Sequence, residues 1–168
     1  GGIAALATAA QAYRLAPLLS IETLLYPVSF VVSALVLGAV TSGMLLGHWY
    51  LIDHDLSIDP FRAQFRFFVR MLALQAALFI VSVGLLPVLG TAASAGKVDQ
   101  LLHVHGALLG VRLLLSPLTT AGFAWMIGRT LRIPQTMAAT GLFYIAILSV
   151  LVGEMMGRFI LFRTSLPF

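Results

Sequence analysis

Long apolar segments separated by short polar turns constrain the fold of this chain more than any other feature. Four segments approach or exceed the roughly 20 residues that an α-helix needs to cross a bilayer. They cover residues 24–52, 61–89, 101–127 and 135–162. A bilayer holds no water that could satisfy free backbone groups, so segments of this length are expected to be helical. The sequence therefore predicts an all-α, polytopic transmembrane helix bundle with four spans.

The N-terminal residues form a separate, shorter apolar stretch. Residues 1–12 are small and apolar, and they are too few to span a bilayer alone. We expect a fifth, partial helix there, either the end of a longer span or a helix at the membrane interface. The chain begins with Gly1 in place of methionine, which we interpret as processing or a preceding segment. No linker or low-complexity tract divides residues 1–168, so we expect a single transmembrane helical domain.

The composition excludes several classes of function. Hydrophobic residues make up 60% of the chain and charged residues only 10%, a balance that a soluble domain of this size would not show. The net charge of +4 is divided between loops and membrane-embedded sites, so it does not indicate a nucleic-acid partner. The chain has no cysteine. Disulfides, thiolate-bound iron–sulfur clusters and covalently attached c-type haem are therefore excluded within it.

Charged residues inside the apolar segments mark a candidate site. Glu154 and Arg158 lie four residues apart within the last segment, and each costs roughly 2.5–3.5 kcal/mol in hydrocarbon unless it faces protein or water. Arg112 lies at a similar depth in the third segment, counted from the same side of the membrane. We predict an Arg112–Glu154–Arg158 cluster with His103 or His105 above it. It would be a ligand-binding or proton-relay site, or a buried ion-pair network that only fixes helix packing.

Alternating spans place the polar residues on two sides of the membrane. One side holds the residues from His48 to Arg70 and from Arg129 to Arg132. The other side holds Arg14, Glu22, Lys97, Asp99, His103, His105 and Arg163. The first side carries more arginine near the helix ends, so we predict that it faces the cytoplasm, with the chain in a bacterial cytoplasmic membrane.

The histidines are candidate axial ligands of haem b or of a chlorophyll-type pigment. His48 and His103 are predicted to lie roughly 30 Å apart, near opposite membrane faces, and so cannot share one haem. His103 and His105 point to different faces of one helix and cannot hold one iron either. Three arrangements stay open. They are a haem held between His103 or His105 and Met155 or Met156, a haem shared with another subunit, and a single histidine that ligates a pigment. The alternative is that these histidines only form hydrogen bonds at helix ends.

Three arginines with helical spacing begin the second span. Arg62, Arg66 and Arg70 share one helical face and alternate with phenylalanines. One interpretation is that their side chains reach from the helix end to the membrane interface. The other is that they contact anionic lipid headgroups or an acidic partner.

Glycine pairs and an acidic turn complete the motifs. The pairs at positions 43/47, 106/110 and 153/157 have the small-xxx-small spacing that favours close helix packing. The turn at residues 53–59 contains three aspartates and His54, whose spacing fits no known metal loop. We therefore predict no metal site.

The segment Gly153-Glu154-Met155-Met156-Gly157-Arg158-Phe159-Ile160-Leu161-Phe162 resembles a segment in the membrane anchors of dimethyl sulfoxide reductase-type complexes. In that segment a glutamate, a glycine–arginine pair and an aromatic residue close a late helix. The resemblance implies contact with quinones and with soluble molybdenum and iron–sulfur subunits. This chain departs from those anchors because they have about twice as many spans. Residues 47–51 and 139–144 are also similar to uncharacterised bacterial polytopic proteins.

Together these features predict a small integral-membrane subunit of a respiratory or photosynthetic electron-transfer complex. It would contribute a quinone or proton-relay site and contact membrane lipids and other membrane subunits, and it is expected to be a non-catalytic subunit more than an enzyme. The sequence leaves two alternatives. One is a structural accessory subunit that packs against a larger complex, and the other is a subunit that ligates haem or chlorophyll.

Overall fold

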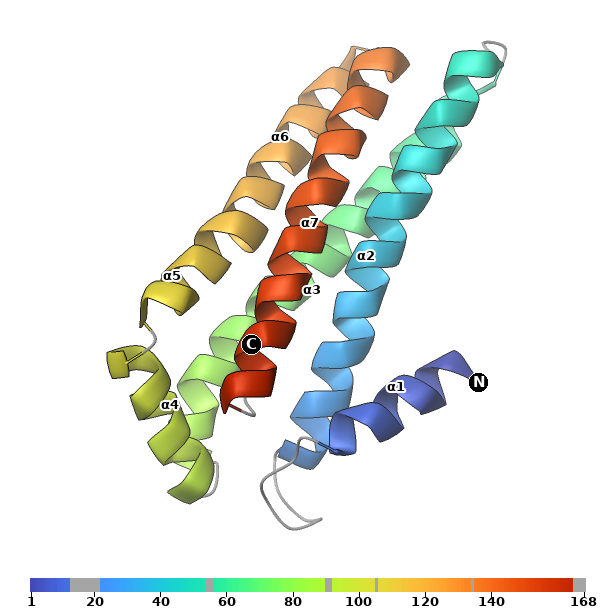
Figure 1. The fold of residues 1–168 in the computed structure, drawn as a ribbon. Coiled ribbons are helices and arrows are strands. Elements are labelled where there is room, and N and C mark those ends of the chain that lie inside the picture. The colour runs from blue at the N-terminus through green and yellow to red at the C-terminus, as the bar shows by residue number, and fades with distance from the viewer. Residues whose placement is uncertain (13–21, 54–55, 90–91, 105, 134, 165–168) are drawn as a thin grey trace.

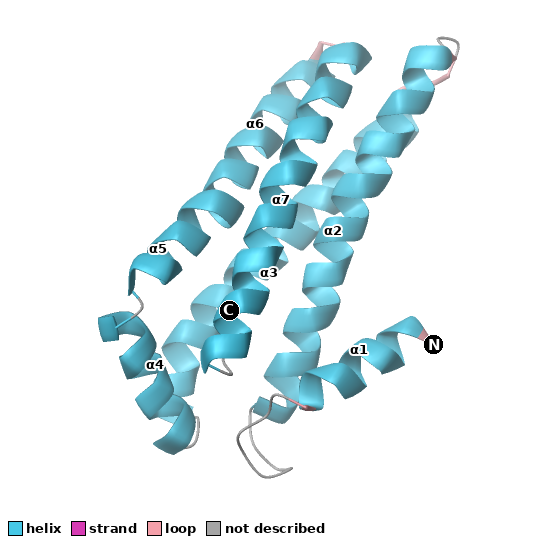
Figure 2. Cartoon of the chain, in the orientation of Figure 1, coloured by secondary structure: helices cyan, strands magenta, loops and turns pink. Residues whose placement is uncertain are grey.

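The computed structural model of the chain describes residues 1–12, 22–53, 56–89, 92–104, 106–133 and 135–164. Within these ranges all the regular elements are helices (Figure 2). In chain order they are α1 (Gly2–Gln11), α2 (Glu22–Ile52), α3 (Asp59–Leu89), α4 (Ala92–Val104), α5 (Gly106–Leu113), the π-helical segment η1 (Leu114–Leu118), α6 (Thr119–Arg132) and α7 (Thr136–Thr164).

Three helices are long and apolar enough to cross a membrane. They cover Leu24–Ile52, Asp59–Leu89 and Thr136–Thr164. Large apolar side chains point outward from the bundle, among them Ile80, Leu148 and Phe162, which are 70%, 61% and 76% exposed. Outward-facing apolar side chains on long helices are the pattern that lipid contact requires, so the structure is consistent with an integral membrane protein.

The third predicted span, residues 101–127, is not one continuous α-helix. Its residues begin inside α4 and continue through α5, η1 and α6, while residue 105 lies outside the described residues. Pro117 lies in η1, where its missing N–H and its ring disrupt the regular α-helical hydrogen bonds. In Figure 1, α5 and α6 follow one another alongside α7, whereas α4 lies at the end of the bundle. The sequence pattern therefore located this helical region correctly.

The short apolar N-terminus forms α1, which has ten residues and is too short to span a bilayer. It lies against the first turns of α2 and is inclined to the bundle (Figure 1). Ala10 is fully buried in a cluster with Leu25, Tyr26 and Phe30. The partial helix expected from the sequence is thus present and is fixed by packing on α2.

An aromatic cluster joins the three long helices. The rings of Tyr50 and Phe61 are stacked with centroids 5.4 Å apart, and Phe143 lies 5.6 Å from Phe61 and 5.9 Å from Phe68. All four side chains are buried. They come from α2, α3 and α7, so this cluster fixes how the long helices approach each other.

Two glycines allow α2 and α7 to pack closely. A Cβ atom on Gly43 would lie 2.5 Å from the Phe143 ring, and one on Gly47 would lie 2.5 Å from Oγ1 of Thr140. These contacts confirm the packing role predicted for the first glycine pair. A Cβ atom added at position 106 or 110 would have no neighbouring atom within 4 Å, and the pair at 153 and 157 is buried in α7.

Replacing Gly43 by alanine is expected to destabilise the bundle, because the added methyl group must displace the Phe143 ring. Gly38→Ala is the matched control on the same helix, since no atom lies within 4 Å of its Cβ position. There the higher helix propensity of alanine should raise stability by up to about 1 kcal/mol. Unfolding in detergent should therefore shift in opposite directions for the two variants. Equal shifts would show that α2 and α7 do not meet at Gly43.

Candidate functional site

Glu154 lies on the inward face of α7, and only 8% of the residue is exposed. It shares this face with the buried residues Val150, Gly157 and Leu161, which recur at helical spacing. The apolar periodicity of α7 thus directs the carboxylate into the bundle, where a charge needs partners.

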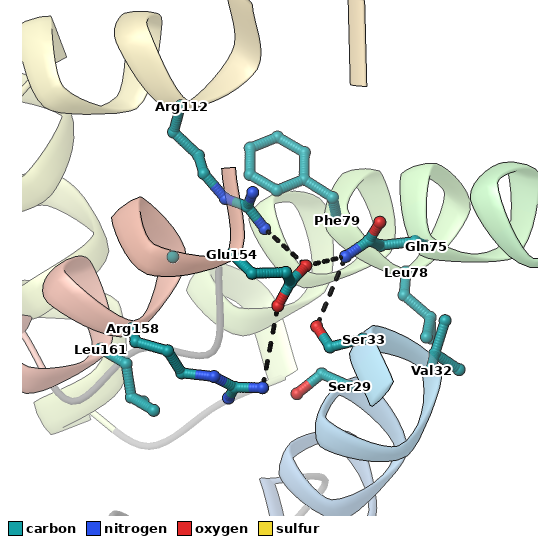
Figure 3. A pocket seen from close by; sticks show the side chains of 11 residues that line it. Ser29, Val32, Ser33, Gln75, Leu78, Phe79, Arg112, Glu154, Arg158 and Leu161 are labelled. Atoms are coloured by element: carbon teal, nitrogen blue, oxygen red, sulfur yellow. Dashed lines mark hydrogen bonds and ion pairs between the residues drawn. The ribbon is translucent and has the colours of Figure 1, made fainter. Parts of the chain in front are cut away.

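Two guanidinium groups neutralise this carboxylate (Figure 3). Nη2 of Arg112 lies 3.7 Å from Oε1 of Glu154, and Nη2 of Arg158 lies 3.8 Å from Oε2. The structure therefore brings together the three charged residues that the depth count predicted. Both separations are longer than a direct hydrogen bond, so they leave room for reorganisation.

Two polar residues of the site were missed by the sequence analysis. Nε2 of Gln75 in α3 donates a hydrogen bond of 2.5 Å to Oε1 of Glu154 and one of 3.4 Å to Oγ of Ser33 in α2 (Figure 3). The available signal was an amide side chain in the middle of an apolar span, which requires a polar partner. Gln75 and Ser33 extend the cluster to four helices.

Arg112 is the most deeply buried cation of the cluster, with 6% of the residue exposed. Its Nη1 donates a hydrogen bond of 2.5 Å to the carbonyl of Gly153, whereas its buried Nε–H has no partner in the described part of the protein. The cluster thus contains two cations, one carboxylate and an unused donor. Such an arrangement favours a ligand oxygen that accepts hydrogen bonds or carries negative charge.

Arg158 connects the cluster to the protein surface. Its side chain is 43% exposed, and its guanidinium carbon lies 4.0 Å from the centroid of the Phe30 ring. This cation–π contact holds the guanidinium between Glu154 and the buried Phe30 ring of α2. The carboxylate is therefore buried yet close to a half-exposed polar group.

Cavities border the cluster on two sides. One of about 40 Å³ is lined by Ser29, Ser33, Gln75, Glu154 and other residues, and has room for about one water molecule. A second of about 20 Å³ lies beside Arg112, Gln75 and Phe79. An open groove of about 510 Å³ between α3 and the α5–η1 region shares four lining residues with this second cavity. They are Ala76, Phe79, Leu113 and Pro117.

The described histidines lie outside the charged cluster. Nδ1 of His48 lies 3.4 Å from the Tyr144 hydroxyl, and Nε2 of His103 lies 3.3 Å from Oδ1 of Asp99. Neither lines the cavities beside Glu154. The end of α2 that carries His48 and the helix α4 that carries His103 are at opposite ends of the bundle (Figure 1). His105, the third predicted ligand, lies outside the described residues.

The arginines at the start of α3 differ in their surroundings. Arg62 donates hydrogen bonds of 3.3 and 3.1 Å to the carbonyl of Leu131 and lies 3.9 Å from Asp59. It therefore satisfies a carbonyl at the C-terminal end of α6. Arg66 and Arg70 are exposed and line a separate groove between α3 and α6.

Among the described residues, no three His, Asp or Glu side chains come close enough together to hold a metal ion. His54 and Asp55 of the acidic turn lie outside those residues. The chain matches no protein-family model, and comparisons with curated proteins and with solved structures gave no match either. The resemblance of residues 153–162 to quinone-interacting anchors accordingly stays a prediction.

Proposed function

We propose that the chain is a small integral-membrane subunit of an electron-transfer complex, and that it binds a quinone headgroup beside the Arg112–Glu154–Arg158 cluster. The observation that carries this proposal is an excess of hydrogen-bond donors next to an apolar groove. Arg112 supplies a buried N–H without a partner in the described part of the protein, and the groove approaches it from the lipid-facing side of α3.

The groove suits a flat apolar ligand that enters from lipid. Its volume of about 510 Å³ lies within the range of small-molecule sites, and its lining includes Phe79, Ile80 and Leu114. Phe79 also lines both small cavities beside the charged cluster. A quinone ring in the groove could therefore direct one carbonyl towards Arg112 and Gln75 after a small movement of Phe79.

The side chains match the chemistry of quinone reduction. A quinone takes up two electrons and two protons, and its carbonyl oxygens become negatively charged as the electrons arrive. The guanidinium of Arg112 would stabilise this charge by donating hydrogen bonds. Glu154 would pass the two protons in turn, taking each from water in the small cavity, giving it to a reduced quinone oxygen and returning to the carboxylate form. The electrons would come from a redox subunit, which the resemblance implies to contain iron–sulfur clusters.

The proposed setting is a bacterial cytoplasmic membrane. In this proposal the α5–η1–α6 region also spans the membrane, as the third of four spans, and the side with His48 to Arg70 and Arg129 to Arg132 faces the cytoplasm. The larger number of arginines near these helix ends supports that orientation. Other membrane subunits would contact the exposed apolar faces of the bundle.

Filling the groove tests the binding step without altering the charged cluster. Gly110→Phe should weaken binding of a short-chain quinone at least tenfold, because Gly110 lines the groove and no atom surrounds its Cβ position. Gly141→Phe is the matched control, since this exposed glycine on α7 also has no atom within 4 Å. Binding can be measured by titrating the quinone into purified protein in mild detergent. Equal affinity in the two variants would contradict this site.

A second candidate function is structural. Ser33, Gln75, Arg112 and Glu154 come from four different helices, and their contacts form one connected polar network. Such a network can fix the register and orientation of helices in a bundle. In that case the chain would be an accessory subunit that packs against a larger complex, and loss of the network would change assembly with little direct effect on electron transfer.

A further inference from the structure

We propose that the groove between α3 and α6 binds an anionic phospholipid, with the phosphate held by arginines and an acyl chain lying along the apolar floor. This groove has a volume of about 660 Å³ and is distinct from the proposed quinone groove, although both include Ala76 and Pro117. The inference does not depend on the proposed quinone site.

Four exposed arginines border one end of this groove. Arg66 and Arg70 come from α3, and Arg129 and Arg132 come from α6. Within the described residues none of them has a carboxylate at ion-pair distance, and Arg129 instead lies over the Trp125 ring at 5.4 Å. Four cations without a carboxylate partner among the described residues form a site for a strongly anionic group.

The antiparallel arrangement of the two helices places all four cations at the same end. Arg66 and Arg70 lie near the N-terminal end of α3, whereas Arg129 and Arg132 lie in the last turn of α6. The lining then changes from charged to apolar with distance from this end, through Val69, Leu72 and Ala73 on α3 and Ala124 and Ala121 on α6. A charged end followed by an apolar channel along the bundle matches the shape of a phospholipid.

The floor of the groove is shaped by a small residue. A Cβ atom on Gly128 would lie 3.1 Å from the Phe65 ring, so glycine lets the two helices approach at the arginine end. A second hollow of about 360 Å³ next to it is lined by Arg62, Arg66 and Arg132. An acidic segment of a partner protein would use the arginines but not the long apolar floor, so the observations favour a lipid.

Trp125 provides a direct probe because it lines the groove and is 66% exposed. The chain has two tryptophans, so Trp49→Phe leaves Trp125 as the reporter. In mixed micelles, phosphatidylglycerol with brominated acyl chains should quench Trp125 more strongly than brominated phosphatidylcholine. Arg66→Gln should weaken the affinity for phosphatidylglycerol about fivefold. The double variant Arg66→Gln with Arg132→Gln should weaken it about thirtyfold. High salt should reduce the preference in the parent protein.

Arg163→Gln is the matched control, because it removes one positive charge from α7 near the opposite end of the bundle. It should leave the quenching unchanged. The proposal is overturned if both lipids quench equally, or if Arg163→Gln weakens binding as much as Arg66→Gln. Displacement of the brominated lipid by an equal concentration of glycerol phosphate would instead indicate a phosphate site without acyl-chain binding. Stronger displacement by a polyglutamate peptide would indicate a protein partner, and either result rejects the lipid.

Discussion

Replacing Glu154 by leucine is expected to lower the free energy of unfolding by about 3–5 kcal/mol, because it leaves the buried guanidinium of Arg112 without its carboxylate. Arg112→Leu should cost less, since the remaining carboxylate keeps Arg158 and Gln75 as partners. Replacing Arg112 by leucine and Glu154 by methionine together should recover most of the loss, because no deeply buried charge then remains without a partner.

Unfolding of the purified chain by denaturing detergent measures these differences. Asp99→Leu is the control, because it removes a carboxylate from a contact with His103 in which both side chains are more than three-quarters exposed. That change should stay within about 1 kcal/mol. If Glu154→Leu lowers the free energy of unfolding no more than Asp99→Leu does, Glu154 is not a buried, paired carboxylate in the folded protein.

Glu154→Gln is expected to slow quinone reduction by about a hundredfold or more while the bundle remains folded. Glutamine keeps the size of the side chain and can still contact Arg112 and Gln75, but it cannot carry a proton. Proton transfer by a positioned side chain typically contributes 10²–10⁴-fold to a rate, which sets the expected size of the effect. The measurement is single-turnover reduction of a short-chain quinone by the assembly purified in mild detergent.

Two controls separate chemistry from structure in this experiment. Arg163→Gln, outside the cluster, should retain the rate of the parent protein. The amount of co-purifying redox subunit should match between Glu154→Gln and the parent. The unfolding midpoint should fall, because glutamine does not neutralise Arg112, but it should stay above the temperature of the assay. A parent-like rate in Glu154→Gln would reject the proton-relay role, and a slow rate caused by lost subunits would favour the structural alternative.

The parts of this fold that depend on strong periodic signals could be predicted from the sequence. Length and hydropathy identified the three long helices, because uninterrupted apolar segments have few alternative structures in lipid. Counting residues from the membrane face placed Arg112 and Glu154 at a similar depth, because each residue of a regular α-helix adds a fixed rise. Both inferences needed only the geometry of single helices.

The remaining features depend on how helices rotate and pack, which a single sequence does not specify. Gln75 reaches Glu154 only because α3 presents that face to α7, and His103 contacts Asp99 on its own helix. Pro117 indicates a disturbance of the helix, but the sequence does not specify that the disturbance is a π-helical segment. Arg62 resembled Arg66 and Arg70 in sequence, yet it contacts the end of α6.

The most direct test of the central claim is whether Glu154 changes its protonation when a bound quinone is reduced. Redox-induced infrared difference spectroscopy of the purified assembly detects the stretching band of a protonated carboxyl group. We predict that such a band changes on quinone reduction in the parent protein and is absent from the Glu154→Gln spectrum. Identical carboxyl bands in both proteins, or no carboxyl change in the parent, would contradict a proton-relay role for Glu154.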